Sequence, residues 1–424
     1  MEESANSVIV DNIRYHFRNE EMILLESQMT EHPSSESSFL AIRPKNRIQA
    51  SGDSIEMEFG GEKELITMNP WDALKLFRER CGQWIFGYFG YDLKNYTEHI
   101  FSKNRPVVQM PDLLFFEPEW LFQIKNGEVK QWLGEEIPKL LNTSPKQTPL
   151  SKGDTVLEPQ ITKDDYVQTV KSIQRMIRDG DFYELNFSYP LKGYYPGESY
   201  PLYRQMRDIS PVPFGAYLSF GQTAVCCASP ERFLKKSGSK IISEPIKGTA
   251  ERSIDPVLDE VRKEELQNEK NRAENLMIVD LVRHDLAKIA LNGTVHVSKL
   301  YDVQTFGTVH QLISTVEAEV SPDADPVEVI KSCFPMGSMT GAPKIEVMKV
   351  IDDLESYKRG LYSGSIGYIT PESDFDFNVV IRTAILQNGD LIYPVGGAIT
   401  SDSDPLQEWD ETEIKSRVIT NVFL

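Results

Sequence analysis

The chain has 424 residues and a formal net charge of −19 at pH 7, with 40% hydrophobic and 10% aromatic residues. This apolar content supports a large core in one or two domains, whereas the acidic balance argues against nucleic acid or an anionic membrane as a partner. An anionic substrate therefore needs a local basic pocket or a bound cation. The acidic start lacks an apolar leader and no apolar window is long enough for a membrane helix, which predicts a cytoplasmic protein.

The first third of the chain is predicted to be mostly antiparallel strands. Short apolar runs at 7–10, 22–25 and 39–42 alternate with polar turns, and aromatic-rich runs at 84–91 and 113–125 predict buried strands. A helix is expected from Pro70 to Cys81, because proline in the first helical turn gives up no hydrogen bond. Regular βαβ units are absent, so the pattern predicts an α+β fold.

A change of composition divides the chain. Residues 142–159, rich in Ser, Thr, Lys and Pro, have the composition of a linker and separate 1–150 from 160–424. We expect the two parts to interdigitate in one globular unit. After the linker, Thr162 is predicted to cap a helix of about 18 residues that ends at Gly180, and a strand follows at 182–189.

The next stretch predicts a β-hairpin. Apolar runs at 232–234 and 240–242 flank a turn containing Gly238, which can take the positive φ that such a turn needs. Pro245 cannot donate a ladder hydrogen bond, so the second strand is expected to end there.

This hairpin is expected to place Lys247 at a strand end beside Glu231. Gly248 would let the backbone approach a ligand, and Thr249 follows it. A partly desolvated lysine has a lowered pKa and can act as a nucleophile, with Glu231 as the proton donor to a leaving oxygen. The alternative on spacing alone is an ordinary surface ion pair.

Residues 271–290 predict a helix that is apolar nearly all round and therefore buried. Charged residues inside such a helix have to be paired or bound to a ligand. For Asp280, Arg283 and Asp285 a buried ion-pair network is the simplest interpretation. Glu274, near the helix start, is the better metal-ligand candidate.

Residues 305–320 predict a strand that carries His310, and a lone histidine on a strand is usually a hydrogen-bonded core residue. Residues 334–344, which include Ser338, are rich in Gly, Ser, Thr and Pro before a helix and present N–H groups to an anion, without the spacing of a nucleotide-binding loop. Further strands are expected at 361–370, 375–386 and 391–400. The second of these carries Arg382.

The last helix, predicted at 404–422, places Glu408, Glu411 and Lys415 on one face. This pattern alone is ordinary for a surface helix. The alternative is a metal site. The carboxylates of Glu408 and Glu411, one turn apart, together with that of Glu274 would suit Mg²⁺, which takes most of its ligands from water and substrate.

Seven stretches, in order, carry a family resemblance: Gly180-Asp-Phe-Tyr-Glu-Leu-Asn, Ser229-Pro-Glu-Arg-Phe, Pro245-Ile-Lys-Gly-Thr, Arg272-Ala-Glu-Asn-Leu-Met-Ile-Val-Asp-Leu, 334–344, Arg359-Gly-Leu-Tyr-Ser-Gly and Val395-Gly-Gly-Ala-Ile-Thr-Ser-Asp-Ser-Asp-Pro. Together they resemble the chorismate-utilising enzymes, which include the large subunits of anthranilate synthase and aminodeoxychorismate synthase, together with isochorismate and salicylate synthases. The resemblance covers roughly 160–424 and implies antiparallel sheets packed face to face, with helices outside. It fits the first third only loosely.

The resemblance also implies a set of site residues. Glu274 and Glu411 would hold Mg²⁺ on the ring carboxylate of the substrate, with Glu408 at or near the metal, and His310 would lie near the leaving hydroxyl. The residues that would line the pocket and bind substrate are Gly248, Thr249, Ser338, Tyr362, Arg382, Gly396, Gly397 and Lys415. Ser338 stands where the family often has Thr, and Ala398 replaces a frequent Gly.

Two positions bear on the reaction. Family members that add water carry a lysine base where this chain has Glu184, which disfavours isochorismate or salicylate formation. Pro245-Ile-Lys-Gly-Thr differs from the Pro-Ile-Ala-Gly-Thr of anthranilate synthases and resembles the aminodeoxychorismate synthases. That branch implies covalent catalysis by Lys247 with Glu231, giving 4-amino-4-deoxychorismate for para-aminobenzoate and folate synthesis.

The chain has no Gly-x-Cys-x-Gly, so a separate glutamine amidotransferase subunit is expected to supply ammonia.

Three alternatives stay open at this point. The chain could be anthranilate synthase component I, in the synthesis of tryptophan, or an inactive chorismate-binding homologue. Leu24-Leu25-Glu26-Ser27 also resembles a tryptophan-binding motif, but its usual companion is altered to Ser210-Pro-Val-Pro-Phe. Identification of the product from chorismate, Mg²⁺ and ammonium would separate the enzymatic alternatives.

Overall fold

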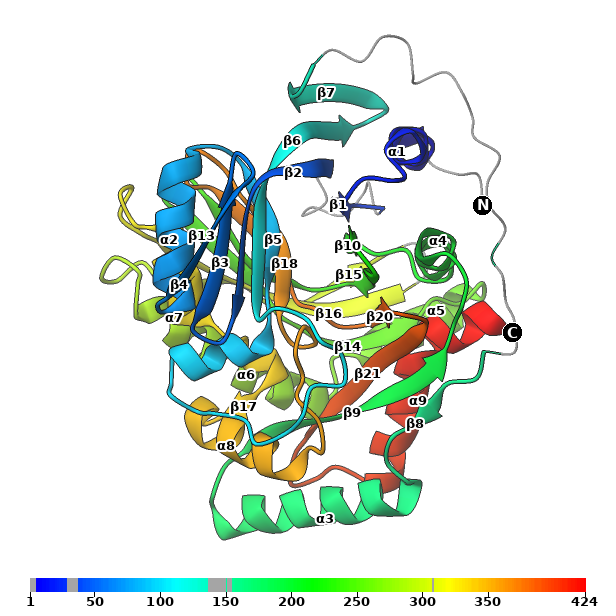
Figure 1. Ribbon diagram of the computed structural model, residues 1–424. Helices are drawn as coiled ribbons and strands as arrows, with labels where there is room; N and C mark the ends of the chain where they lie inside the picture. Colours follow the sequence, from blue (N-terminus) through cyan, green and yellow to red (C-terminus); the bar gives the residue numbers. More distant parts are fainter. Residues whose placement is uncertain (1–4, 29–36, 136–149, 151–154, 307–308) are drawn as a thin grey trace.

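The computed structural model describes residues 5–28, 37–135, 150, 155–306 and 309–424 (Figure 1). Its helices are α1 (Ala5–His16), α2 (Pro70–Cys81), α3 (Lys163–Asp179), α4 (Ser199–Ile209), α5 (Pro256–Glu265), α6 (Glu269–Ala287), α7 (Pro326–Cys333), α8 (Lys344–Leu354) and α9 (Pro405–Phe423), with short 3₁₀ helices η1 (Tyr91–Tyr96) and η3 (Gly337–Met339). In the part of the chain that the structure describes, none of the helices has both the length and the hydrophobicity that crossing a membrane requires.

The strands up to the hairpin are β1 (Met22–Glu26), β2 (Ser38–Ser51), β3 (Ser54–Phe59), β4 (Glu62–Thr67), β5 (Ile85–Phe89), β6 (Leu113–Lys125), β7 (Glu128–Leu133), β8 (Glu158–Pro159), β9 (Glu184–Tyr194), β10 (Phe214–Phe220) and β11 (Thr223–Ser229). Those that follow are β12 (Arg232–Ser237), β13 (Lys240–Glu244), β14 (Ile246–Glu251), β15 (His296–Thr305), β16 (Val309–Glu319), β17 (Gly341–Ala342), β18 (Ser365–Ile369), β19 (Phe375–Asn378), β20 (Thr383–Gln387) and β21 (Asp390–Ile399).

Antiparallel strands form the interior and helices cover them, which confirms the predicted α+β fold. Figure 1 shows α2 and α7 on one side of the strands, α4 and α9 on the other, and α3 and α8 at one end. One buried apolar cluster is built from strand and loop residues alone, including Ile23, Phe86, Ala216 and Ile385. Two larger clusters join the helices to the strands. The core therefore has a layer between sheets as well as layers between sheet and helix.

Strands from the two ends of the chain pair with each other. In β1, Leu24 lies opposite Tyr217 of β10, and in β5, Gly87 lies opposite Gly367 of β18. The first 150 residues thus contribute strands to sheets that residues after 160 complete. Most of the predicted linker, 142–159, lies outside the described residues.

Several predicted elements are confirmed. Helix α2 has Pro70 in its first turn and Asn69 as its N-cap, and α3 runs from the Thr162 cap to Gly180, whose φ is 91°. The hairpin β12–β13 turns at Gly238, with a φ of 59°, and β13 ends before Pro245. Local turn and cap chemistry sets these boundaries, so they can be derived from short stretches of sequence.

Four predictions are wrong. The apolar run at 7–10 lies in helix α1, because a short apolar run fits either element. Residues 375–386 form two strands, with Arg382 between them, and 305–320 span the end of β15 and all of β16. Helix α6 is not buried all round: Leu276 is 49% exposed, and the α6 ion pair of Asp280 and Arg283 lies on the surface.

The N-cap of α9 gives a stability prediction. The Asp404 carboxylate accepts hydrogen bonds from the backbone N–H groups of Leu406 and Gln407, both at 3.0 Å. We expect Asp404→Ala to lower the free energy of unfolding by about 1 kcal/mol, measured by urea denaturation. The control is Asp402→Ala, since this nearby exposed carboxylate accepts a hydrogen bond from the Ser401 hydroxyl instead. Equal stability of the Asp404 variant and wild type would contradict the capping role.

Candidate active site

A cavity of about 560 Å³ lies between β9, β14, β21, α6 and α9, a volume typical of small-molecule sites. The predicted site residues that line it are Glu231, Lys247, Gly248, Thr249, Glu274, Ser338, Tyr362, Arg382, Gly396, Gly397, Glu408, Glu411 and Lys415. Positions spread over almost 200 residues of sequence thus meet around one space. His310 is the predicted site residue that does not line this cavity.

Lys247 stands on β14 where the ladder with β16 is irregular, between Ile246 and Thr249, and Gly248 next to it has a φ of 89°. Its Nζ lies 3.2 Å from Glu184 Oε1 and 3.4 Å from Glu274 Oε2. The hairpin was expected to pair Lys247 with Glu231, but its ion-pair partners are these two other carboxylates. Glu184 was missed as a site residue, although its replacement of the family's lysine by an acidic group was a signal.

The charge state of Lys247 also differs from the prediction. Burial lowers the pKa of the Lys247 ammonium, but the carboxylates of Glu184 and Glu274 raise it more, so the net pKa lies above its usual value. The expectation of a lowered pKa rested on burial and a neighbouring Mg²⁺ and did not include the two carboxylates, whose effect is the opposite. An attacking amine at this position requires that the ammonium first lose a proton.

Glu231 lines the cavity and is 6% exposed. Burial raises the pKa of its carboxyl from 4.5 to about 7, although a hydrogen bond from Ser338 and the charges of Lys247 and Arg382 act in the opposite direction. A carboxyl with this pKa holds a proton for much of the time at neutral pH, as a general acid must.

The three candidate metal ligands come from facing helices. Glu274 projects from α6, and Glu408 and Glu411 project from α9 into the same cavity. Lys270 Nζ lies 4.0 Å from Glu274 Oε1 and 3.9 Å from Glu408 Oε1, and burial together with Glu411 raises the pKa of Glu408. The site thus concentrates negative charge that a cation would offset.

The chemistry of these three carboxylates decides whether the site suits Mg²⁺. Among the described residues, no three His, Cys, Asp or Glu side chains lie close enough together to hold a metal by themselves. Carboxylate oxygens are nevertheless the ligands that Mg²⁺ prefers, and this ion commonly takes only one or two of them beside water and substrate. Glu274, Glu408 and Glu411 therefore fit the ion by their chemistry.

Cationic groups also line the cavity. Arg382 has a φ of 50° between β19 and β20, and its guanidinium makes no hydrogen bond or ion pair with another residue that the structure describes. Lys415 Nζ donates to the Gly396 carbonyl at 3.1 Å and lies 3.5 Å from Glu411. Arg382 is thus available to a substrate carboxylate.

Gly396 and Gly397 differ in whether a side chain would fit at their positions. A Cβ at Gly396 would lie 2.5 Å from the Phe187 carbonyl oxygen, so the close pairing of β21 with β9 requires glycine there. A Cβ at Gly397 would approach the Lys415 ammonium to 3.4 Å and the Glu408 carboxylate to 3.5 Å. These are ordinary van der Waals distances, so sterics do not require glycine at 397.

A buried arginine behind the cavity was also missed. Arg359 donates to the backbone carbonyls of Met339 at 2.7 Å and Asn186 at 2.8 Å, and pairs with Glu355 at 2.6 Å. Met339 and Asn186 both line the cavity. In the sequence, the motif that begins at Arg359 was only a sign of the family. The structure shows that the Arg359 side chain hydrogen-bonds the backbone of two residues that line the cavity.

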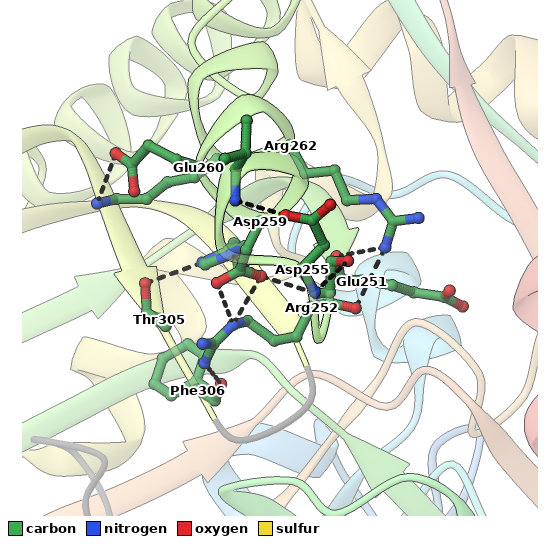
Figure 2. A network of polar contacts seen from close by, with 12 residues as sticks. Glu251, Arg252, Asp255, Asp259, Glu260, Arg262, Thr305 and Phe306 are labelled. Atoms are coloured by element: carbon green, nitrogen blue, oxygen red, sulfur yellow. Dashed lines mark hydrogen bonds and ion pairs between the residues drawn. The ribbon is translucent and has the colours of Figure 1, made fainter.

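His310 lies in a separate polar network, which Figure 2 shows around Asp259 and Thr305. Its Nε2 is 3.0 Å from Asp259 Oδ1 and its Nδ1 is 2.9 Å from Thr305 Oγ1, and the residue is 1% exposed. The role near a leaving hydroxyl stays a prediction that this arrangement does not support.

A second cavity, of about 480 Å³, lies apart from the first. Leu25, Glu26 and Ser27 line it together with Pro213 and Phe214. The two sequence stretches compared with a tryptophan-binding motif thus lie side by side, and tryptophan binding stays a prediction.

Comparisons with known proteins agree with this geometry. The family model described as chorismate binding enzyme matches residues 20–421. Aminodeoxychorismate synthase component 1 from Klebsiella aerogenes is 30% identical over 412 residues, which cover 92% of this chain and 91% of the relative. The chloroplastic aminodeoxychorismate synthase of Arabidopsis thaliana is 35% identical over 89% of this chain.

The plant relatives are much longer, and this chain spans less than half of their length. Among solved structures, anthranilate synthase component I from Streptococcus pneumoniae superposes with a TM-score of 0.79 at 26% identity, covering 92% of this chain and 93% of the other. The sequence match and the fold lead to one conclusion. The chain belongs to the chorismate binding enzyme family.

Proposed function

We propose that the chain is the large subunit of a cytoplasmic aminodeoxychorismate synthase, which converts chorismate and ammonia to 4-amino-4-deoxychorismate for para-aminobenzoate and folate synthesis. The names of its bacterial and plant relatives support this activity. The observation that carries the proposal is Lys247, a mostly buried amine that lines the same cavity as Glu231, whose carboxyl has a raised pKa. A nucleophile and a proton donor in one pocket suit displacement of a ring hydroxyl.

The reaction can be written as two balanced displacements. The neutral amine of Lys247 forms a bond to C2 of chorismate, the ring double bonds shift, and the C4 hydroxyl leaves as water with the proton of Glu231. The alkylated amine then returns one proton to Glu231. Ammonia next bonds to C4 and the C2–N bond breaks. Glu231 gives its proton to the departing Lys247 nitrogen and then takes one proton from the new ammonium group at C4, so the net reaction exchanges hydroxyl for amino and releases water.

The remaining cavity residues bind and orient the substrate. Bound Mg²⁺, held by Glu274 and Glu411 with Glu408 nearby, would offset the charge of the ring carboxylate. Arg382 and Lys415 would bind the substrate carboxylates, and the backbone of Gly396 and Gly397 would lie against them. Glu184 would keep the Lys247 side chain in place, which removes rotational freedom before the attack.

The source of ammonia gives the test of this function. We expect the purified chain with Mg²⁺ and ammonium to turn chorismate into the 4-amino product, with a rate that rises as pH approaches the ammonium pKa because only free NH₃ attacks. With glutamine it should be inert until a glutamine amidotransferase subunit is added, as the sequence has no glutaminase motif. Product analysis by chromatography and mass spectrometry measures both results. Glutamine-dependent turnover by the pure chain would contradict this division of labour.

The second candidate is anthranilate synthase component I, which the superposition on the Streptococcus pneumoniae structure favours. It would release the 2-amino aromatic acid and pyruvate instead of the 4-amino product. The same product analysis therefore decides between the two activities.

A further inference from the structure

Helix α5 lies beside the active-site cavity without burying any of its own residues. Val257 is 75% exposed, and Leu258 and Val261 are 43% and 42% exposed. The hydrophobic effect therefore contributes little to holding α5 in place, and an isolated helix of this length is not stable in water. Polar contacts have to hold it.

Those contacts converge on Asp259, in the middle of α5 (Figure 2). Arg252 Nε donates to both carboxylate oxygens at 2.9 Å, and the Ser253 N–H donates to Oδ1 at 2.8 Å. His310 Nε2 lies 3.0 Å from the same oxygen. The Arg252 guanidinium holds the pKa of the Asp259 carboxyl well below its usual range, so the group stays charged.

Arginines extend the network to the strands on either side. Arg252 Nη1 donates to the Phe306 carbonyl at 2.9 Å, just beyond the end of β15. Arg262 Nη1, on α5, donates to the carbonyls of Glu251 at 3.1 Å and Arg252 at 3.2 Å, at the end of β14. The helix is thus tied to the strand that carries Lys247.

His310 is fully engaged in this network. A carboxylate can only accept, so His310 Nε2 carries the hydrogen that it donates to Asp259. In a neutral ring Nδ1 is then the acceptor for the Thr305 hydroxyl. Both nitrogens have protein partners, which leaves neither of them for a substrate.

The position of α5 bears directly on the cavity wall. Glu251 before it and Leu266 after it both line the cavity, and Val309, next to His310, lines it as well. Leu266 then leads into α6, where Lys270 and Glu274 also face the cavity. A displacement of α5 would move this whole wall.

We propose that Asp259 is a positioning residue, which together with Arg252, Thr305 and His310 forms a clasp that keeps α5 and the adjoining cavity wall in place. In this chain His310 acts through the clasp and not on the substrate ring.

Asp259→Asn and His310→Asn, singly and combined, test the clasp. We expect amide hydrogen exchange in residues 256–266 to accelerate about tenfold in each, while exchange in α3 stays unchanged. The KM for chorismate should rise several-fold with a smaller change in kcat. The KM of the double variant should not exceed that of the more impaired single variant, since both substitutions break the same network. The matched control is Glu260→Gln on the same helix, whose carboxylate pairs with Lys263 on the surface at 3.3 Å.

Thr305→Val is a milder variant that removes one hydrogen bond at the far side of His310. It should accelerate the same exchange about threefold, so the test does not depend on the stability of the Asp259 variant. The clasp is refuted if His310→Asn lowers kcat by orders of magnitude while exchange in 256–266 stays at the wild-type rate, or if Asp259→Asn changes neither measurement. Exchange needs no turnover, so this result is independent of the reaction proposed above.

Discussion

The rate at which Lys247→Ala forms the 4-amino product is expected to fall by several orders of magnitude, because no other amine would be held at C2 of the substrate. Chorismate binding should stay within about tenfold of wild type, since Arg382 and the proposed Mg²⁺ would still hold the substrate carboxylates. Some 2-amino product is expected from the variant, because ammonia can enter the space that Lys247 leaves. Chromatography of the products and isothermal titration with chorismate measure the two effects.

The covalent intermediate can be seen directly. Intact-protein mass spectrometry of wild type, quenched with chorismate and Mg²⁺ but without ammonia, should show an adduct that peptide mapping assigns to Lys247. Lys240→Ala, which removes a half-exposed lysine paired with Glu317 on the sheet surface, serves as the control and should retain the adduct. If no adduct forms and Lys247→Ala makes the 4-amino product at the wild-type rate, Lys247 is only an ion-pair partner of Glu184 and Glu274.

Glu231→Gln should have the second largest effect on activity. Glutamine has nearly the same shape but cannot give a proton to the departing C4 oxygen, so adduct formation should slow by about 10²–10⁴-fold. The quenched mass-spectrometric assay measures this step without the separate pH dependence of ammonia. Glu346→Gln, an exposed glutamate paired with Lys349, should leave the rate unchanged.

The same variant should be more stable than wild type at alkaline pH. Burial raises the pKa of the Glu231 carboxyl from 4.5 to about 7 in the folded chain. Below pH 4.5 both states are protonated and the carboxyl has no effect on stability. Between pH 4.5 and 7 the unfolded chain ionises first, so wild-type stability falls as pH rises, by about 3 kcal/mol in total. Urea denaturation at pH 5 and pH 8 should show a gain for Glu231→Gln that grows with pH, and a constant difference would contradict the raised pKa.

The sequence motifs predicted which residues line the cavity better than they predicted which of these residues contact one another. Gly248, Arg382 and Glu411 all line the predicted space, because residues that bind one substrate have to meet around it. The partner of Lys247 was not predictable in the same way. Glu184 lies 63 positions away on β9, and only the pairing of β9 with β17 and β21 brings it there.

Elements bounded by caps and turns were predictable, and those shaped by tertiary packing were not. Thr162 and Gly180 delimit α3 from local chemistry alone. By contrast, the apolar residues of α6 predicted full burial, whereas the helix borders an open cavity on one face. The break at Arg382 depends on a left-handed backbone conformation, with a φ of 50°, that is rare outside glycine and is not written in the local pattern.

The pairing of β5 with β18 has a consequence for biosynthesis on the ribosome. Strands β2 to β6 leave the ribosome early, but the partner for the free edge of β5 is translated only near the end of the chain. At the usual 5–20 residues per second, the interval between β6 and β18 is roughly 10–50 s. During that time an apolar strand edge stays open to other nascent chains, so the yield of folded protein should depend on translation speed and on chaperones that shield the edge.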